Sequence, residues 1–231
     1  MKQILLTKEQ ITQIVKDQNL RISLAGESIA YFFAIYLSHH FDSPLAKFHH
    51  EFFRIAENDK IPLSIILGFR GCGKSTIFTL CYALWAILGK QKKRFVLILT
   101  KNQTQAKQIT KNLIRELENN AVLKADAGPF TEDDSEMSAY TIYLKKYGVR
   151  IMVATVEQSI RGIREGSIRP EIIMLDDVEG LEEMGTMEGR DKLFNWYTRD
   201  IYSLRAPKAR IIIVGTQLHP DDLIGRLVTL F

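Results

Sequence analysis

The 231-residue sequence contains only two cysteines and no apolar run long enough to cross a bilayer. Cys72 and Cys81 have no cysteine or histidine partners at zinc-finger spacing, which excludes a disulfide framework and a cysteine-based metal finger. The longest uncharged stretch, residues 75–89, is shorter than the roughly 20 residues of a membrane span and predicts a buried helix. Residues 1–10 also lack the apolar run of a signal peptide. We therefore expect an intracellular protein with no membrane partner.

Neither sign of charge dominates the sequence. Its 31 Lys and Arg residues against 27 Asp and Glu leave a formal net charge of +4, which permits a nucleic-acid partner but does not require one. Apolar residues make up 46% and charged residues 25%, a balance that excludes a disordered or coiled-coil chain. The length fits one large α/β domain, alone or with a small appendage.

Two kinds of pattern divide the chain near residue 60. Helical periodicity runs through residues 8–58, and Pro44 is placed to begin a second helix within it. Beyond residue 62, apolar runs alternate with helical patterns, which is typical of a mostly parallel sheet flanked by helices. We predict a helical N-terminal segment at 1–60 and an α/β core at 61–231. Strands are expected at residues 63–67, 95–100, 150–155, 172–175 and 210–216, and helices at 75–88, 104–119 and 190–204.

Two segments of the core depart from the strand–helix alternation. Residues 141–145 and 149–154 flank a short turn that ends in Gly148, which predicts an antiparallel β-hairpin. The acidic segment 126–138 contains Gly128-Pro129 and predicts a surface loop.

Residues 68–76 read Gly-Phe-Arg-Gly-Cys-Gly-Lys-Ser-Thr and match the phosphate-loop pattern G-x-x-x-x-G-K-[ST] in full. The motif follows a predicted strand and opens a predicted helix, as this chemistry requires. Glycines let the main chain wrap an anion with inward-pointing N–H groups, and the helix presents its positive end to phosphate. Lys74 is expected to place a charge between the terminal phosphates, and Ser75 a hydroxyl on Mg²⁺. The sequence therefore predicts a P-loop that binds ATP and Mg²⁺.

Carboxylates follow the apolar run at residues 172–175, at the edge where open α/β sheets bind ligands. Asp176, the first of them, is placed to hold Mg²⁺ through water. A second acid beside it can polarise the attacking water as a general base. Asp177 is the adjacent candidate and Glu179 the longer alternative, and the sequence does not choose between them.

Three arginines share the short connector that precedes this acidic strand. Arg161, Arg164 and Arg169 are candidates for a guanidinium that reaches the nucleotide γ-phosphate, in the same subunit or in a neighbour. Arg161 is the first choice among them. Arg70, inside the phosphate loop, is a further candidate sensor.

Two other regions are candidates for contact with the nucleotide. Thr216 and Gln217 end the last apolar strand, where a hydroxyl or an amide can sense the γ-phosphate. His49 or His50 lies in an aromatic-rich stretch before the phosphate loop and is a candidate for contact with adenine. Asp221-Asp222, after the last strand, fits helix capping at least as well as catalysis. The predicted nucleotide-binding residues are Gly68, Arg70, Gly71, Cys72, Gly73, Lys74, Ser75, Thr76, His49 and Thr216.

Taken together, these motifs resemble the ATPase domain of the phage large terminase subunit, the DNA-packaging motor. The phosphate loop is common to many ATPases. More specific are Ser159-Ile160-Arg161-Gly162 leading to the double-Asp strand, and the ending Gly215-Thr216-Gln217-Leu218-His219-Pro220-Asp221-Asp222. The resemblance implies a P-loop NTPase fold of the ASCE type, with a mostly parallel central sheet flanked by helices and a helical N-terminal segment.

The resemblance also implies roles and partners. Lys74 and Ser75 would bind phosphate and Mg²⁺, Asp176 would be the Walker B acid, and Asp177 or Glu179 would activate water. Arg161 resembles a finger offered to the next subunit of a ring, and Thr216 a coupling residue. The implied partners are double-stranded DNA, a portal protein, a small terminase subunit and further copies of the chain, in the host cell cytoplasm.

Large terminases carry an RNase H-like nuclease after the ATPase, whereas this sequence stops at Phe231. We interpret it as a truncated or unusually short relative, with no nuclease activity expected from these residues. Two alternative functions stay open. One is a helicase-like or remodelling ATPase, which would need a second lobe, and the other is an ATP-binding assembly scaffold without turnover.

Overall fold

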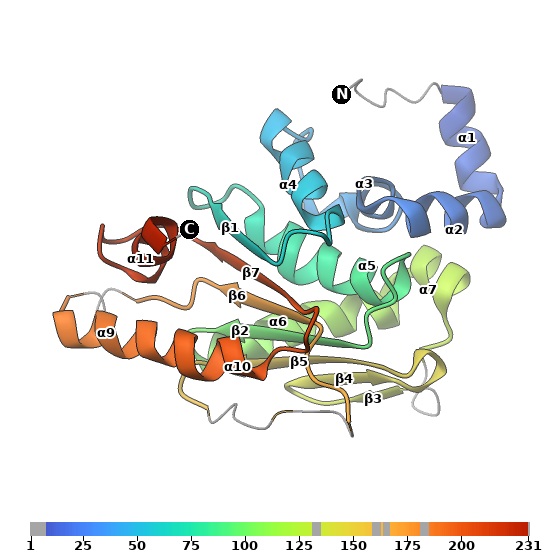
Figure 1. Cartoon of the computed structure of the whole chain (residues 1–231). Coiled ribbons are helices and arrows are strands. Elements are labelled where there is room, and N and C mark those ends of the chain that lie inside the picture. Colours follow the sequence, from blue (N-terminus) through green and yellow to red (C-terminus); the bar gives the residue numbers. More distant parts are fainter. Residues whose placement is uncertain (1–7, 131–134, 159–162, 164–166, 181–184, 231) are drawn as a thin grey trace.

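The computed structural model describes residues 8–130, 135–158, 163, 167–180 and 185–230, without the side chains of residues 8–11. A seven-stranded sheet runs through its centre in the order β1-β7-β6-β2-β5-β4-β3 (Figure 1). The first five strands in that order are parallel, and β3 and β4 add an antiparallel end. The strand bounds are β1 Leu63–Leu67, β2 Phe95–Thr100, β3 Ser135–Met137, β4 Thr141–Leu144, β5 Val149–Thr155, β6 Ile172–Asp176 and β7 Arg210–Gly215.

The position of β7 gives the fold its class. β7 pairs with β1 on one side and with β6 on the other, so it separates the P-loop strand from the acidic strand. This is the arrangement expected of the ASCE type. The central strands β2, β6 and β7 are buried along their whole length, in agreement with their continuous apolar runs.

Helices cover both faces of the sheet and create two apolar clusters. Alternate residues of the strands point to opposite faces, so Met174 joins one cluster and Leu175 the other. The first face carries the N-terminal helices, η3 (Thr76–Tyr82), α5 (Ala83–Leu88), α6 (Gln103–Asn119) and α7 (Ala121–Ala127). The second face carries α9 (Met187–Trp196), η5 (Tyr197–Ile201), α10 (Tyr202–Leu204) and α11 (Leu223–Leu230). The predicted helices on both faces are therefore confirmed.

The N-terminal segment is helical, as its periodicity predicts. It comprises α1 (Lys8–Lys16), α2 (Gln18–Glu27), α3 (Ile29–Phe32), η1 (Phe33–Leu37), η2 (Ser38–His40) and α4 (Lys47–Glu57). Its apolar residues belong to the same cluster as the first face of the sheet. The predicted boundary near residue 60 stays a prediction. Among the described helices, none is long and apolar enough to cross a membrane.

Arg210 ties α4 to the sheet. Its guanidinium, at the start of β7, donates to the carbonyl of Ala56 at 2.8 Å, to the carbonyl of Ile55 at 2.5 Å and to the hydroxyl of Ser64 at 3.1 Å. These carbonyls lie at the carboxyl end of α4, where the helix dipole favours a cation. The contact fixes α4 beside the strand that leads into the phosphate loop.

The hairpin prediction is confirmed, and two local predictions are wrong. β4 and β5 pair antiparallel across the short helical turn η4 (Lys145–Tyr147) and Gly148, whose φ of +60° suits glycine. Part of the predicted loop 126–138 is structured instead: it contains the strand β3 and the end of α7. The Asp126 side chain is 1% exposed there, where it pairs with Arg21 at 2.8 Å and accepts a hydrogen bond from Tyr36 at 2.9 Å. The second helix begins at Lys47 rather than at Pro44.

Candidate functional site

The phosphate-loop motif lies between β1 and η3, at the carboxyl edge of the parallel strands. Gly71 and Gly73 adopt φ angles of +82° and +75°, in the left-handed region that favours glycine. A side chain at Gly73 would also collide with the ring of Phe41. The pattern of glycines is therefore required by the path of the main chain.

Lys74 and Ser75 each face one carboxylate at the end of β6. The Ser75 hydroxyl donates to Asp176 Oδ1 at 3.0 Å, and Lys74 Nζ lies 3.7 Å from Asp177 Oδ2. The Lys74 and Asp176 residues are each only 6% exposed. Burial raises the pKa of Asp176 to about 7 with a further contribution from the Asp177 carboxylate, while the Ser75 hydrogen bond acts against both. The structure thus joins the two motifs that the sequence separates by about a hundred residues.

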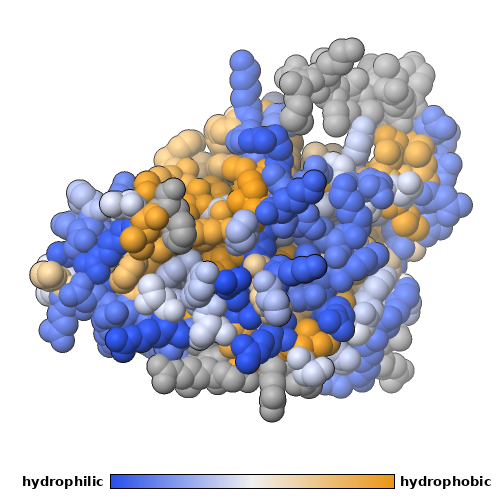
Figure 2. All heavy atoms as spheres, viewed as in Figure 1, coloured by the Kyte–Doolittle hydropathy of each residue, from blue (hydrophilic) through white to orange (hydrophobic). Residues whose placement is uncertain are grey.

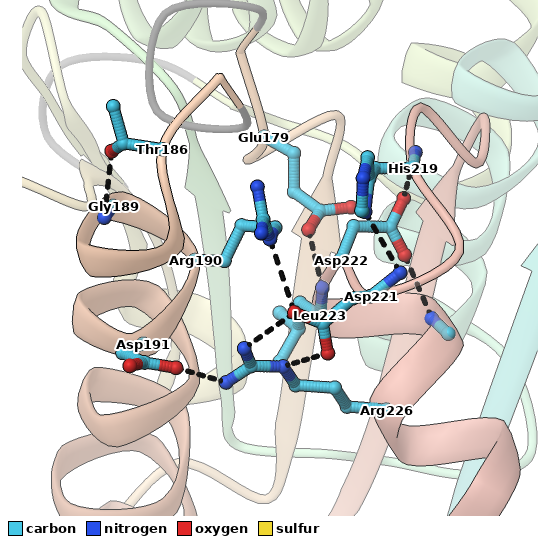
Figure 3. A network of polar contacts seen from close by, with 11 residues as sticks. Glu179, Thr186, Gly189, Arg190, Asp191, His219, Asp221, Asp222, Leu223 and Arg226 are labelled. Carbon is cyan, nitrogen blue, oxygen red and sulfur yellow. Dashed lines mark hydrogen bonds and ion pairs between the residues drawn. The ribbon is translucent and has the colours of Figure 1, made fainter.

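Asp177 and Glu179 occupy different environments. Asp177 has a φ of +45°, and its side chain is 45% exposed beside Lys74. Glu179 turns toward the helix α11, where its Oε1 accepts the N–H of Leu223 at 2.7 Å (Figure 3). Burial raises the pKa of Glu179 to about 7, and the Leu223 hydrogen bond opposes this rise. Both acids line the same cavity, but only Asp177 is left facing the lysine.

Thr216 connects the end of β7 to the start of the phosphate loop. Its hydroxyl donates to the carbonyl of Gly68 at 2.9 Å, and the N–H of Gly68 donates to Gly215 at 3.1 Å. A change at the phosphate loop therefore has a direct hydrogen-bonded path to β7. Thr216 also lines the cavity beside the loop, and its contact with the nucleotide stays a prediction.

His49 lies beneath the phosphate loop with both ring nitrogens engaged. Nδ1 accepts the N–H of Ala46 at 2.9 Å, so Nε2 carries the proton and donates it to the carbonyl of Cys72 at 3.0 Å. Burial lowers the pKa of His49, which keeps the ring neutral. The imidazole supports the loop from below, and the predicted contact with adenine would require one of these hydrogen bonds to break. His50 is half-buried and has no contact of this kind among the described bonds.

Replacing His49 with Ala is expected to destabilise the fold by about 1–3 kcal/mol, because the buried carbonyl of Cys72 and the partly buried N–H of Ala46 lose their partner. Chemical denaturation measures the change in the free energy of unfolding. The matched control is His50→Ala, which removes the neighbouring imidazole and should leave the unfolding midpoint almost unchanged. Equal losses in the two variants would contradict the supporting role of His49.

A network of charges fixes α11 against α9 behind the site (Figure 3). Asp222 is fully buried and accepts the N–H groups of Leu218, His219 and Gly225, as a helix-capping carboxylate does. The prediction that these acids cap a helix is therefore confirmed for Asp222. Arg226 of α11 bonds Asp221 at 2.8 Å and pairs with Asp191 of α9 at 2.7 Å.

Asp221 gives this network a defined pH dependence. Hydrogen bonds from Arg226 and Arg190 lower the pKa of Asp221 to about 2. A lowered carboxyl pKa stabilises the fold above the ordinary value near 4, and the contribution is lost as the pH falls toward 2. Asp221→Asn should lower Tm by a constant amount above pH 5, and the difference should close toward pH 2. Thermal melts of Asp42→Asn, at an exposed aspartate, provide the control. A difference independent of pH would contradict the assignment.

A cavity of ≈ 460 Å³ opens between the phosphate loop and the ends of β6 and β7. Its lining includes Arg70, Lys74, Asp177, Glu179 and Thr216, and also two residues that sequence reasoning missed, Lys101 and Gln105. The missed residues follow the carboxyl end of β2. The sequence signal was present, because a polar residue after a buried strand is expected at this same edge.

Two exposed phenylalanine rings lie close together beside the phosphate loop, a contact that sequence reasoning did not predict. Phe69 in the phosphate loop is 64% exposed, and its ring lies 5.7 Å from that of Phe48 on α4. Figure 2 shows apolar surface gathered on the face over α11 and the end of β1. The Phe48 and Phe69 rings offer a platform on which a base can stack.

The arginines of the connector fall in different places. Arg161 and Arg164 lie outside the described residues. Arg169 lies before the start of β6, at the opposite edge of the sheet from the cavity, and it donates to the carbonyl of Ser203 at 3.1 Å. Its candidacy as the γ-phosphate arginine within the same subunit is therefore wrong. Arg70 does line the cavity.

No family model and no curated protein matches the sequence. Solved structures do match its fold. The large terminase of bacteriophage HK97 superposes with a TM-score of 0.55 at 12% identity over 90% of this chain, which spans 40% of the HK97 protein. A mutant ATPase domain of the Thermus phage P74-26 large terminase gives 0.50 at 13% identity, covering 82% of this chain and 71% of that one. The predicted resemblance to terminase ATPase domains and the P-loop ASCE class are thus confirmed at the level of the fold.

Proposed function

We propose that the chain is an ATPase that hydrolyses ATP with Mg²⁺ to move double-stranded DNA, as the motor of a phage large terminase. The observation that carries the proposal is the pair of contacts that join the phosphate loop to the end of β6. Ser75 meets Asp176 and Lys74 meets Asp177, and the second of these pairs lines the cavity. A glycine-rich turn without a nucleotide would not need two carboxylates aligned with its lysine and serine.

The donors at this position fit Mg²⁺, which prefers oxygen ligands and retains several waters. The Ser75 hydroxyl and the buried Asp176 carboxylate are hard oxygen donors within hydrogen-bond distance of each other. When bound, Mg²⁺ would neutralise the charge that develops on the phosphates. Lys74 and the main-chain N–H groups of the phosphate loop would bind and orient those phosphates, and the Phe48–Phe69 platform would hold the base.

Asp177 is the proposed general base, in preference to Glu179. Its carboxylate is exposed to the cavity beside Lys74, whereas Glu179 is occupied by the first turn of α11. A water between Asp177 and the γ-phosphate would lose a proton to Oδ2 as its oxygen attacks the γ-phosphorus, and the bond from that phosphorus to the bridging oxygen would break and release ADP. Thr216, bonded to the phosphate loop, would pass the loss of the γ-phosphate to β7.

The partners belong to the same proposal. Arg161 would reach the nucleotide of a neighbouring copy in a ring, which would sit on a portal protein with a small terminase subunit in the host cytoplasm. An arginine supplied in this way is typically worth ~10³–10⁵ in rate, so turnover per molecule should rise with protein concentration.

The test measures phosphate release with duplex DNA, with single-stranded DNA and without DNA. The motor predicts that duplex DNA increases turnover and that single strands increase it less. A larger effect of single strands would favour the helicase-like alternative. Tight ATP binding without release under every condition would favour the scaffold. Lys74→Ala serves as the inactive control in each case.

A further inference from the structure

A second group of reactive side chains lies outside the phosphate-loop cavity, where η2 of the N-terminal segment meets α6. His39 and His40 come from η2 and Glu116 from α6. Glu116 Oε1 lies 3.1 Å from His39 Nε2 and 2.9 Å from His40 Nε2. One ligand atom of each residue lies within 4.8 Å of the other two.

These three side chains are of the types that bind a zinc-class metal. Imidazole nitrogen and carboxylate oxygen bind Zn²⁺ at about 2.0–2.2 Å, in a tetrahedron whose neighbouring ligand atoms are about 3.4 Å apart. The two N···O distances fall a few tenths of an ångström short of that edge. The His39 side chain is 56% exposed and is free to shift outward by this amount, while the Glu116 side chain, at 4% exposure, supplies a fixed point.

The charge of Glu116 is the second observation that points to a cation. Its buried carboxylate accepts a hydrogen bond from Asn120 Nδ2 at 2.8 Å, which orients it as an outer partner of a metal ligand would. Among the described ion pairs, its partners are His39 and His40 alone, neither of which carries a permanent charge. A buried carboxylate requires a positive partner, and a divalent ion between the three ligands provides one.

A cavity of ≈ 380 Å³ gives the site an entrance. It is lined by His39 and Glu116, together with Ser38 and Asn119, so a water can take the fourth position of a tetrahedron. Arg115 also lines this cavity and opposes a cation there. Removing its charge should therefore strengthen metal binding.

We propose that His39, His40 and Glu116 bind one divalent transition-metal ion of the zinc class. The ion ties η2 of the N-terminal segment to α6 on the first face of the sheet. The proposal is independent of nucleotide hydrolysis, because none of its ligands lines the phosphate-loop cavity. Sequence reasoning missed the site, since it searched for cysteine spacing and Glu116 is brought to the histidines only by folding.

The test titrates the tag-free, chelator-treated chain with ZnCl₂ by calorimetry, in excess Mg²⁺ so that the phosphate-loop site is not counted. One equivalent should bind to wild type. His39→Ala and His40→Ala should each weaken binding by at least ~10-fold. His50→Ala is the matched control and should bind as wild type does, and Arg115→Gln should bind more tightly.

Two readouts keep the test independent of folding defects. Co²⁺ in place of Zn²⁺ should give the visible absorption of a tetrahedral site in wild type and lose it in His39→Ala, whose side chain is 56% exposed in wild type. Zn²⁺ should raise the Tm of wild type but not of that variant. Zinc affinity equal in wild type and in the double variant His39→Ala/His40→Ala would overturn the proposal.

Discussion

Replacing Asp177 with Asn is expected to lower the rate of phosphate release by ~10²–10⁴ while ATP still binds, because general-base catalysis typically contributes that factor. The amide cannot accept the proton of the attacking water at neutral pH. Asn tolerates the φ of +45° that Asp177 adopts, so the main chain should keep its course. Removing the carboxylate also frees Lys74 from its partner at 3.7 Å, so ATP affinity should stay the same or increase.

Glu179→Gln is the variant that separates the two candidate bases. The Gln side-chain oxygen can still accept the N–H of Leu223, so α11 should remain in place and turnover should fall much less than in Asp177→Asn. Single-turnover phosphate release, with ATP binding measured separately, distinguishes them. A large loss in Glu179→Gln together with near-normal turnover in Asp177→Asn would assign the base to Glu179 instead.

Lys74→Ala is expected to reduce kcat/KM for ATP by ~10²–10³, which is the usual cost of losing one preorganised donor to a developing charge. Lys74 is only 6% exposed and sits inside the loop, so water replaces its ammonium poorly. Lys74→Arg should rescue little, since the planar guanidinium does not fit a site shaped for a compact charge. Titration with a fluorescent ATP analogue measures the affinity, and phosphate release measures the rate.

The control for Lys74→Ala is Lys60→Ala, which removes the same charge from an exposed position before β1. It should bind and hydrolyse ATP as wild type does. The melting curves of wild type and Lys74→Ala must also coincide, so that a loss of activity is not caused by unfolding. This comparison is needed because loss of Lys74 leaves two neighbouring carboxylates without their cation. Unchanged kcat/KM in a folded Lys74→Ala protein would contradict the assignment of residues 68–76 as a phosphate-binding loop.

The parallel part of the fold could be predicted from the sequence because its strands are buried on both faces. Their apolar runs are continuous, and the phosphate loop fixes which strand comes first. β3 could not be predicted in the same way. It is short, and it pairs with β4 of the hairpin. The acidic residues in and around it are typical of a surface loop, so the sequence predicts a loop there. Asp126 was predicted to lie in a surface loop, because its charge is typical of one. Its ion-pair partner Arg21 lies far away in the sequence, so the sequence pattern could not show that the side chain is buried.

The site was predictable wherever a residue type is dictated by phosphate chemistry. Gly71, Gly73 and Lys74 follow from a motif with a mechanism, and the carboxylates follow from the end of a buried strand. The orientation of a side chain does not follow from such patterns. The sequence did not choose between Asp177 and Glu179 as the general base. Only the folded structure shows that Glu179 turns toward α11. His49 was expected near adenine, yet its imidazole bonds to the underside of the loop.

The central claim is that this cavity hydrolyses ATP, and Mg²⁺-dependent phosphate release by the purified chain tests it most directly. Wild type should release phosphate from ATP with a turnover per molecule that rises with protein concentration. Phosphate release should disappear when a chelator removes Mg²⁺. Lys74→Ala should release almost none under the same conditions. ATP bound tightly by folded wild type with no phosphate released, at any protein concentration and with duplex DNA present, would contradict the claim.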